Sequence, residues 1–253
     1  MIGVYEENIN TIPGLVVVDT EKENKALPIL TYFHGFTSSK EINLPLAYLL
    51  ADKGYRVVLP DSKYHGERET EISSTKMQIS FWDIVMKNVE ELQVIKDYFD
   101  EKGLILNDRF GVAGTSMGGI TTSAALTQYS WIKVSAVLMG SPKIATYAQT
   151  LVSSFREMGE LPITEEMIDQ LYEQLKLYDI STQTDKLKDR PLLFWHGESD
   201  AVVPFDHSYT FYEEVKKLYK NPDNIQFLKE ANQGHKVSRP AILETVKWFD
   251  KHL

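Results

Sequence analysis

Ser116 stands in a pattern that is typical of a catalytic nucleophile. It is the centre of the pentapeptide Gly-Thr-Ser-Met-Gly at 114–118, which follows an apolar run at 109–113 and precedes a small-residue stretch at 119–126. The pattern predicts a strand, a sharp turn and a helix. In such a nucleophile elbow the strained turn lifts the hydroxyl above the sheet edge, and the two glycines avoid clashes between strand and helix. Because Gly-x-Ser-x-Gly also occurs in ordinary turns, the assignment depends on the rest of the chain.

A serine nucleophile needs a histidine base, and the histidine needs a carboxylate that fixes its tautomer. His235 lies in a glycine-containing loop after the last predicted strand, and Asp200 lies in the turn 196–204 after the strand before it. Glu198, in the same turn, is a second candidate for the acid. The chain order serine, acid, histidine is the one expected of a sheet that carries such an elbow. We therefore predict that Ser116, Asp200 and His235 form a catalytic triad.

Two backbone N–H groups must also face the oxyanion that forms during acyl transfer. The Met117 N–H directly follows the nucleophile, and the Phe36 N–H follows the end of a predicted strand. We predict these two groups as the oxyanion hole, with the Thr37 N–H as an alternative to that of Phe36. His34 is expected to be structural, and His196 is expected to be a buried, hydrogen-bonded packing residue.

The segment 60–68 follows another strand end and should reach the same rim of the sheet. Its His65 and Arg68 are candidates to contact an anionic part of a substrate. Alternatively, His65 holds this loop by bonding Asp61. His207, early in a predicted helix, is expected to face solvent.

Strands and helices alternate along most of the chain. Segments rich in β-forming residues at 2–9, 15–20 and 29–34, separated by turn or charged residues, predict an antiparallel start to a sheet. Further predicted elements are strands at 55–60, 109–113, 134–139, 192–195 and 225–228, and helices at 44–53, 79–100, 118–128, 205–219 and 240–252. This alternation predicts an α/β fold with a mostly parallel central sheet and helices on both faces.

The alternation stops for about fifty residues, which consist mostly of amphipathic helix and exceed a simple crossover. We predict a single domain over 1–253 with a small helical cap inserted at 143–188. Such a cap would lie over the strand ends, where ligands of open α/β sheets bind. The alternative is an elaborate crossover helix pair without a lid role. Tyr147, Phe155 and Met158 are the apolar candidates to line an acyl site there.

Composition limits the classes of partner. A net charge of −9 argues against a nucleic-acid surface, and the absence of cysteine excludes disulfides and thiolate chemistry. The scattered histidines lack the close pairing of zinc ligands, so no metal is expected. The acidic N-terminus and the lack of an 18-residue apolar run predict a cytoplasmic protein that does not enter membranes. A homodimer is compatible with the sequence.

Taken together, these motifs resemble the α/β-hydrolase superfamily over essentially the whole chain. The segments 34–41 and 61–68, with His196-Gly197-x-x-Asp200, resemble bacterial carboxylesterases grouped with the prolyl oligopeptidase and dienelactone hydrolase branches. The resemblance implies Ser116 as nucleophile, His235 as base and Asp200 as its orienting acid, in an enzyme without metal or cofactor. A chain of this length cannot hold the propeller of the peptidases, and it lacks the cysteine nucleophile of dienelactone hydrolases, so neither of these activities is favoured.

The expected function is that of a serine carboxylesterase, which acts on small-molecule esters through an acyl-enzyme on Ser116. A compact cap leaves limited room, so we expect short acyl chains. The same triad would serve a thioesterase, a lactonase, an aminopeptidase or a cofactor-free haloperoxidase. A hydrolase-like scaffold that binds a ligand without turnover is the alternative from another class. The presence of all three triad residue types favours the enzyme.

Overall fold

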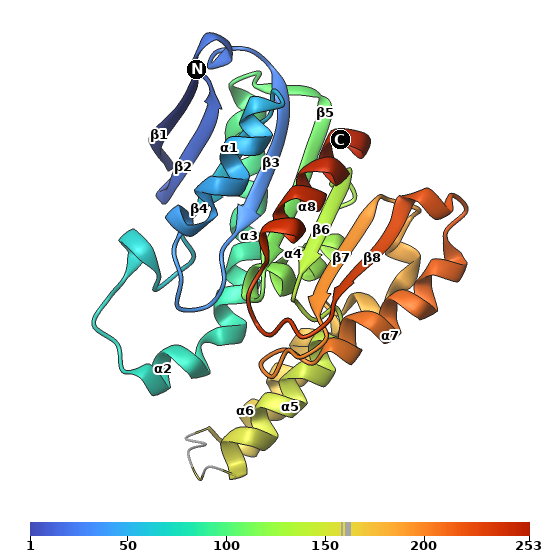
Figure 1. The fold of residues 1–253 in the computed structure, drawn as a ribbon. Helices are drawn as coiled ribbons and strands as arrows, with labels where there is room; N and C mark the ends of the chain where they lie inside the picture. Colours follow the sequence, from blue (N-terminus) through green and yellow to red (C-terminus); the bar gives the residue numbers. More distant parts are fainter. Residues whose placement is uncertain (158, 160–162) are drawn as a thin grey trace.

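The computed structural model describes residues 1–157, 159 and 163–253 and has a single sheet at its centre (Figure 1). Within these residues the sheet has eight strands in the order β1-β2-β4-β3-β5-β6-β7-β8. The strands are β1 (Ile2–Ile9), β2 (Ile12–Asp19), β3 (Leu27–Phe33), β4 (Arg56–Pro60), β5 (Ile105–Thr115), β6 (Val134–Leu138), β7 (Leu192–Gly197) and β8 (Ile225–Glu230). This is the α/β-hydrolase sheet that the sequence predicts.

The sheet begins antiparallel and continues parallel. β1 pairs with β2, and β2 with β4, in antiparallel register, whereas all pairs from β4 through β3 to β8 are parallel. β3 is buried along its whole length, as expected for a strand that is covered on both faces, whereas the edge strand β1 is partly exposed. The parallel strands consequently present their carboxyl ends, and the loops that follow them, along one edge.

Helices cover both faces of the sheet and enclose two cores. α1 (Leu44–Asp52) and α8 (Arg239–His252) pack on one face, and α3 (Phe81–Glu101), α4 (Met117–Gln128) and α7 (Phe205–Val215) pack on the other (Figure 1). The remaining helices are α2 (Ser74–Ile79), α5 (Ile144–Glu157) and α6 (Glu165–Lys176). Short 3-10 helices are η1 (Thr20–Lys22), η2 (Lys40–Asn43), η3 (Gly66–Arg68), η4 (Ile180–Thr182), η5 (Thr184–Leu187), η6 (Lys216–Leu218) and η7 (Pro222–Asn224).

Two predicted helices differ in extent from the observed ones. The helix expected at 79–100 is α3, which begins at Phe81, and a separate helix, α2, precedes it and ends at Ile79. The Ser80 hydroxyl donates to the Lys76 carbonyl at this break, a local bond that apolar periodicity cannot reveal. The helix expected at 205–219 ends at Val215 and continues as η6.

Between β6 and β7 lie α5 and α6, which project beyond the carboxyl ends of the strands (Figure 1). They pack against each other as an antiparallel pair. Met158, one of the expected acyl-site residues, falls outside the described residues. The role of this segment as a cap stays a prediction.

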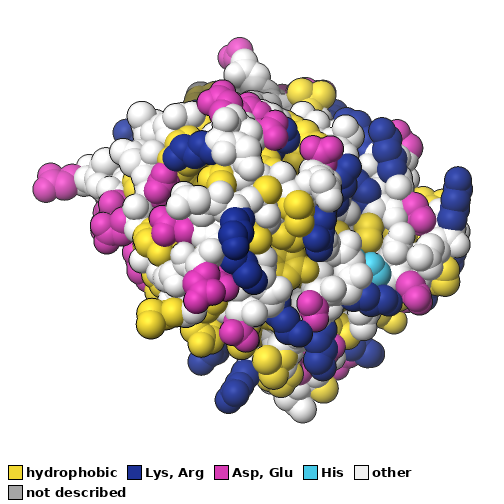
Figure 2. Space-filling view, turned by 90° about the horizontal axis from the view of Figure 1, so that it is seen from above, with side chains coloured by type: hydrophobic (Ala, Val, Ile, Leu, Met, Phe, Trp, Pro, Cys, Tyr) yellow, Lys and Arg dark blue, Asp and Glu magenta, His cyan; other side chains and the backbone are white. Residues whose placement is uncertain are grey.

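The surface in Figure 2 mixes acidic and basic side chains without a continuous patch of one sign on that face. In the described part of the chain, no helix has the length and apolar character needed to cross a membrane.

Candidate active site

Ser116 lies at the sharp turn between β5 and α4, with φ of 55° and ψ of −113°. A positive φ is strained for a residue with a side chain and occurs mainly where the surrounding structure enforces it. The Ser116 N–H donates to the Leu138 carbonyl of β6 at 2.9 Å, which ties the turn to the neighbouring strand. Ser116 therefore has the backbone conformation of a nucleophile elbow.

The glycines at 114 and 118 are required by close backbone contacts. A Cβ added at Gly118 would lie 2.1 Å from the Phe33 carbonyl oxygen of β3, and one at Gly114 would lie 2.3 Å from the Gly118 carbonyl carbon. Both contacts are with backbone atoms, which cannot move aside as a side chain can. The pentapeptide pattern thus reflects the close approach of β3, β5 and α4 beneath Ser116.

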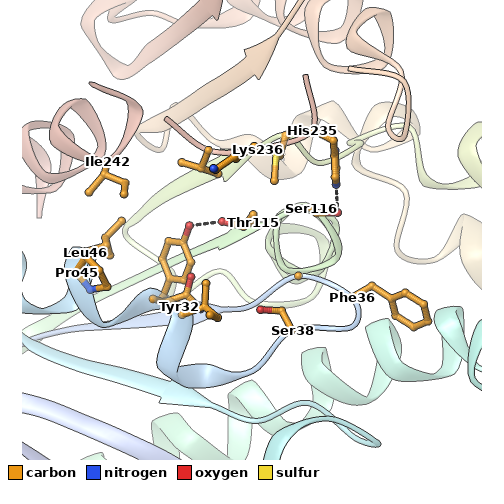
Figure 3. A pocket seen from close by; sticks show the side chains of 15 residues that line it. Tyr32, Phe36, Ser38, Pro45, Leu46, Thr115, Ser116, His235, Lys236 and Ile242 are labelled. Carbon is orange, nitrogen blue, oxygen red and sulfur yellow. Dashed lines mark hydrogen bonds between the residues drawn. The ribbon is translucent and has the colours of Figure 1, made fainter. Parts of the chain in front are cut away.

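A chain of hydrogen bonds connects Ser116, His235 and Asp200. The His235 Nε2 atom lies 2.8 Å from the Ser116 Oγ (Figure 3), and its Nδ1 atom lies 2.7 Å from the Asp200 Oδ2. The Val202 and Val203 N–H groups donate to the other carboxylate oxygen, Oδ1, at 2.8 and 3.0 Å. The structure therefore brings together the three residues that the sequence predicts as a triad.

The Asp200 carboxylate is wholly buried, yet its surroundings favour the charged form. Burial opposes ionisation, but hydrogen bonds from His196, His235 and the two valine N–H groups outweigh it and hold the pKa of Asp200 well below its usual range. Asp200 therefore carries a negative charge where it can orient His235. Glu198, the alternative acid, instead pairs with Lys229 at 3.1 Å.

His196 contacts the same carboxylate, a contact that the sequence analysis missed. Its Nε2 atom lies 3.1 Å from the Asp200 Oδ2 and 3.0 Å from the Val203 carbonyl oxygen. Both neighbours are acceptors, so Nε2 carries a proton and donates. His196 is buried, as expected, and it also anchors the acid. The available signal was the spacing of His196-Gly197-x-x-Asp200 at the end of β7.

The loop after β3 carries the expected oxyanion donors. Met117 begins α4 directly after Ser116, and the Phe36 ring packs edge-on against the rings of His65 and Phe81. The Thr37 N–H donates to the His65 Nε2 at 3.0 Å and is therefore already used, which argues against the Thr37 alternative. The donor roles of the Phe36 and Met117 N–H groups stay predictions.

His65 and Arg68 hold loops in place and do not line the cavities beside Ser116. The buried His65 donates from Nδ1 to the Lys63 carbonyl at 2.8 Å. It does not bond Asp61, because its Nδ1 faces the Lys63 carbonyl and its Nε2 accepts from the Thr37 N–H, while the Asp61 carboxylate accepts from Lys40 and the Glu67 N–H. The expectation of a His65–Asp61 bond is therefore wrong.

Arg68 is likewise committed within the protein. Its guanidinium group binds both carboxylate oxygens of Glu91 at 2.7 and 2.8 Å and donates to the Asp61 carbonyl at 3.0 Å. Glu91 lies on α3, 23 positions away in sequence, so no local pattern indicates this pair. The structure therefore does not support substrate contact through His65 or Arg68.

Two other histidines also lie near these loops. The buried His34 donates from Nδ1 to the Gly35 carbonyl and accepts from the Ser62 N–H, and burial lowers the pKa of His34 to about 4. His34 is thus a neutral structural residue. The expectation that His207 faces solvent is wrong, because its half-buried ring contacts the Ser141 hydroxyl at 3.0 Å and packs edge-on against Tyr147.

Two cavities meet at Ser116 and Phe36, and we name one after His235 and the other after α5, which line them. The His235 cavity, of about 330 Å³, is lined by Tyr32, Gly35, Phe36, Ser38, Ile42, Asn43, Pro45, Leu46, Thr115, Ser116, Met139, His235, Lys236, Val237 and Ile242 (Figure 3). The α5 cavity, of about 290 Å³, is lined by Phe36, Gln78, Phe81, Ser116, Ile120, Tyr147, Leu151, Phe155, Val202 and Val203. Two of the expected acyl-site residues, Tyr147 and Phe155, thus share a cavity with Ser116.

Over 1–157, 159 and 163–253, no group of three or more histidine, aspartate or glutamate residues has an arrangement suitable to hold a metal ion.

Comparison with known proteins places this site in a family. The sequence profile of the prolyl oligopeptidase family matches residues 45–253, which is most of the chain. The chain belongs to the prolyl oligopeptidase family. As a member of this family within the α/β-hydrolase superfamily, it is a serine hydrolase.

Relatives of similar length support this assignment. The chain is 45% identical over 255 residues to YitV of Bacillus subtilis (strain 168), which is named as a candidate esterase, and 26% identical over 253 residues to esterase YjfP of Escherichia coli (strain K12). Each alignment covers 100% of both proteins. The crystal structure of TT1662 from Thermus thermophilus matches with a TM-score of 0.76 over 100% of both chains at 16% identity, which shows the shared fold.

Proposed function

We propose that this chain is a serine carboxylesterase that hydrolyses small esters with short acyl chains through an acyl-enzyme on Ser116. The observation that carries the proposal is the continuous hydrogen bonding from Asp200 through His235 to a serine at a strained elbow, with distances of 2.7 and 2.8 Å. The names of YitV and YjfP, which align along their whole length, support ester hydrolysis over other reactions of this scaffold.

In the acylation half-reaction, the neutral His235 accepts the Ser116 proton at Nε2 while Oγ attacks the ester carbonyl carbon. Because Asp200 accepts from Nδ1, Nε2 is the basic nitrogen, and the charged carboxylate stabilises the imidazolium that forms. The Phe36 and Met117 N–H groups would stabilise the oxyanion. His235 then donates its Nε2 proton to the departing alcohol oxygen.

In the deacylation half-reaction, a water molecule takes the place of the alcohol. His235 removes a proton from the water as its oxygen attacks the acyl carbon, and then returns the proton to the Ser116 Oγ as the acid leaves. Both halves use the same base and the same oxyanion donors. The cycle releases one alcohol and one acid and regenerates the free hydroxyl.

The α5 cavity is suited to the acyl chain. Its wall is formed by aromatic and aliphatic side chains that include Phe81, Tyr147, Leu151 and Phe155, and it opens at Ser116. A cavity of about 290 Å³ lies at the small end of ligand pockets, which fits a short chain. In this proposal α5 serves as the cap, since three of those side chains lie on it.

The test is labelling with a fluorophosphonate, which reacts with activated serines, followed by intact-mass measurement. We expect one adduct on the wild-type protein and none on Ser116→Ala, together with loss of turnover of a p-nitrophenyl acetate substrate. Ser154→Ala is the matched control, because this exposed hydroxyl donates to the Thr150 carbonyl within its own helix, α5. A folded wild-type protein without label would contradict the proposal and favour a binding scaffold.

A further inference from the structure

The direction of proton transfer distinguishes the two cavities at Ser116. During acylation the leaving oxygen must come within hydrogen-bond reach of the His235 Nε2, about 2.6–3.2 Å. His235 lines the His235 cavity and does not line the α5 cavity, whereas Ser116 lines both. The alcohol part of a bound ester therefore extends on the His235 side, and the acyl part extends into the α5 cavity.

The walls of the His235 cavity are mostly apolar. They are formed by aliphatic side chains from the loop and helix after β3, from the end of β6 and from the segment after His235, namely Ile42, Pro45, Leu46, Met139, Val237 and Ile242. An apolar cavity of about 150 Å³ can hold a benzene ring. A volume of about 330 Å³ therefore admits an alcohol with a substituted ring or a branched chain. The α5 cavity is similar in volume, so the position of His235, and not cavity size, distinguishes the two sides.

Two hydroxyl groups lie together within this apolar lining. The Tyr32 hydroxyl and the Thr115 Oγ1 are 2.5 Å apart, and Figure 3 shows the pair beside the turn that carries Ser116. One of the two donates to the other, so the accepting hydroxyl keeps a proton for another partner. Among the residues that the structure describes, neither oxygen has a further hydrogen-bond partner.

The protonation state of the pair is fixed by its surroundings. Tyr32 is 2% exposed, and burial raises its pKa to about 12, so its hydroxyl stays protonated in the working range of an esterase. The pair thus offers one donor proton and free lone pairs within a mostly apolar lining, whose other polar members outside the triad are Ser38, Asn43 and Lys236. The spare proton of the pair faces the cavity, so a ligand with a polar group gains a hydrogen bond at this position that an apolar ligand cannot make.

We propose that the His235 cavity is the leaving-group site of the enzyme and that Tyr32 and Thr115 select esters of bulky alcohols that carry a second hydroxyl group. This inference rests on the proposed esterase function and adds the class of alcohol to it. Apolar contact with the walls selects for size, and the hydroxyl pair selects for the polar substituent.

Acetate esters of methanol, benzyl alcohol and a hydroxybenzyl alcohol test the proposal. All three form the same acetyl-enzyme, so the alcohol influences kcat/KM through acylation and leaves the deacylation step unchanged. We expect kcat/KM to rise from methyl to benzyl acetate, and to rise again by roughly fivefold to tenfold for the hydroxybenzyl ester, which gains one hydrogen bond.

Variants separate the two contributions. Tyr32→Phe and Thr115→Val should each abolish the preference for the hydroxybenzyl over the benzyl ester. Tyr55→Phe is the matched control for Tyr32→Phe, since it also removes a buried tyrosine hydroxyl. Tyr55 directly precedes β4, at the opposite end of the sheet from Ser116, and its hydroxyl donates to the Phe249 carbonyl of α8. The control should keep the wild-type preference.

Cavity-filling variants test the assignment of sides. Ile242→Trp, in the His235 cavity, should remove the higher kcat/KM of benzyl over methyl acetate. Leu151→Trp, in the α5 cavity, should instead narrow the range of acyl-chain lengths that the enzyme hydrolyses. The opposite pattern would reverse the two sites and overturn the inference. A wild-type preference that survives Tyr32→Phe would overturn the role of the hydroxyl pair.

The outcomes also separate this inference from the function on which it rests. If the folded wild-type protein takes no fluorophosphonate label and cleaves no ester, the proposed function fails and the leaving-group site fails with it. If the wild-type protein is labelled and cleaves all three acetates at equal kcat/KM, only the leaving-group site fails. Label stoichiometry measured on each variant shows whether its active site is still assembled.

Discussion

Replacement of Asp200 by asparagine tests whether this carboxylate sets the tautomer of His235. The amide that replaces the carboxylate has one oxygen and one –NH2 group, and the surrounding atoms decide which goes where. The Val202 and Val203 N–H groups donate to the present Oδ1 at 2.8 and 3.0 Å, so the amide oxygen takes that place. The His196 Nε2–H, which donates to the present Oδ2, keeps the Val203 carbonyl as its acceptor. The –NH2 group then faces His235, where it donates to Nδ1.

This orientation forces the inactive tautomer. With Nδ1 as an acceptor, the His235 proton moves to Nε2, which faces the Ser116 Oγ at 2.8 Å and can no longer accept its proton. Turning the amide around would set its –NH2 group against two N–H donors, at a cost of about 1–3 kcal/mol for each unsatisfied group. The wrong tautomer lowers kcat of serine proteases by about 10⁴. For Asp200→Asn we expect a loss of about 10³–10⁴ in kcat, equivalent to about 4–5 kcal/mol.

The assay is steady-state turnover of p-nitrophenyl acetate by the wild-type protein, Asp200→Asn and Glu198→Gln. Glu198 is the matched control, because it is the other acid in the same turn and pairs with Lys229 at the surface. Its substitution should change kcat by no more than about twofold, as expected for an exposed ion pair. An Asp200→Asn enzyme that retains more than about a tenth of wild-type kcat, or a Glu198→Gln enzyme that loses activity, would refute the reasoning.

Three further predictions concern the scaffold of the site. Gly118→Ala should destabilise the protein by at least about 1–3 kcal/mol in urea unfolding, because the new Cβ would lie 2.1 Å from the Phe33 carbonyl oxygen. Arg68→Ala should lower the free energy of unfolding by roughly 3 kcal/mol in the same measurement, because it leaves the buried Glu91 carboxylate without its cation. It should change KM for neutral and acidic esters by the same factor. Burial lowers the pKa of His65 below its usual 6.5, so the unfolded state binds a proton on this residue more readily than the folded state does. The folded protein should therefore lose stability as the pH drops below about 6.5. His65→Gln should show a smaller fall in melting temperature between pH 7 and pH 5.

Matched variants serve as controls for the first two of these predictions. Gly103→Ala places a Cβ where no atom lies within 4 Å, so only its positive φ should cost stability, with activity retained. Arg156→Ala removes an exposed pair with Glu165 and should cost less than about 1 kcal/mol. A Gly118→Ala protein of wild-type stability would contradict the close-packing argument. If Arg68→Ala raises KM for acidic esters and not for neutral ones, Arg68 contacts substrate after all. If the melting temperature of His65→Gln falls between pH 7 and pH 5 as much as that of the wild-type protein, the titration argument is refuted.

The elbow could be predicted from sequence because its residue types stand together in one short motif, and the strand and helix patterns on either side are periodic. The Gly114 contact lies within this motif, whereas the Gly118 contact is with the Phe33 carbonyl of β3 and became visible only in the structure. His235 and Asp200 are far from Ser116 in sequence, but parallel strands bring the loops after their carboxyl ends to one edge. Chain order was therefore enough to predict which loops meet, and the choice of Asp200 over Glu198 agrees with the contacts seen.

The residues that were misassigned have partners that a single sequence cannot indicate. Arg68 was a candidate substrate contact because its loop follows a strand end, but its partner Glu91 comes from the buried face of α3. His207 looked exposed at the start of a helix, but the loop after β6 covers it and supplies Ser141. In both cases the deciding contact depends on how separate elements pack, which local patterns do not encode.

The two histidines that share the Asp200 Oδ2 have different functions because of what their other nitrogens face. His235 turns its Nε2 toward the Ser116 hydroxyl, a group that can give up a proton. His196 has no such partner, because its Nε2 proton is directed at the Val203 carbonyl oxygen as well as at Asp200, and its Nδ1 lies 3.3 Å from the Ser208 hydroxyl, which itself donates to a backbone carbonyl. The Nε2 proton of His196 is therefore not transferred, and the hydrogen bond that it makes fixes the position of the Asp200 carboxylate. A fixed carboxylate in turn leaves His235 a single productive orientation, so the histidine that never meets substrate helps to position the one that does.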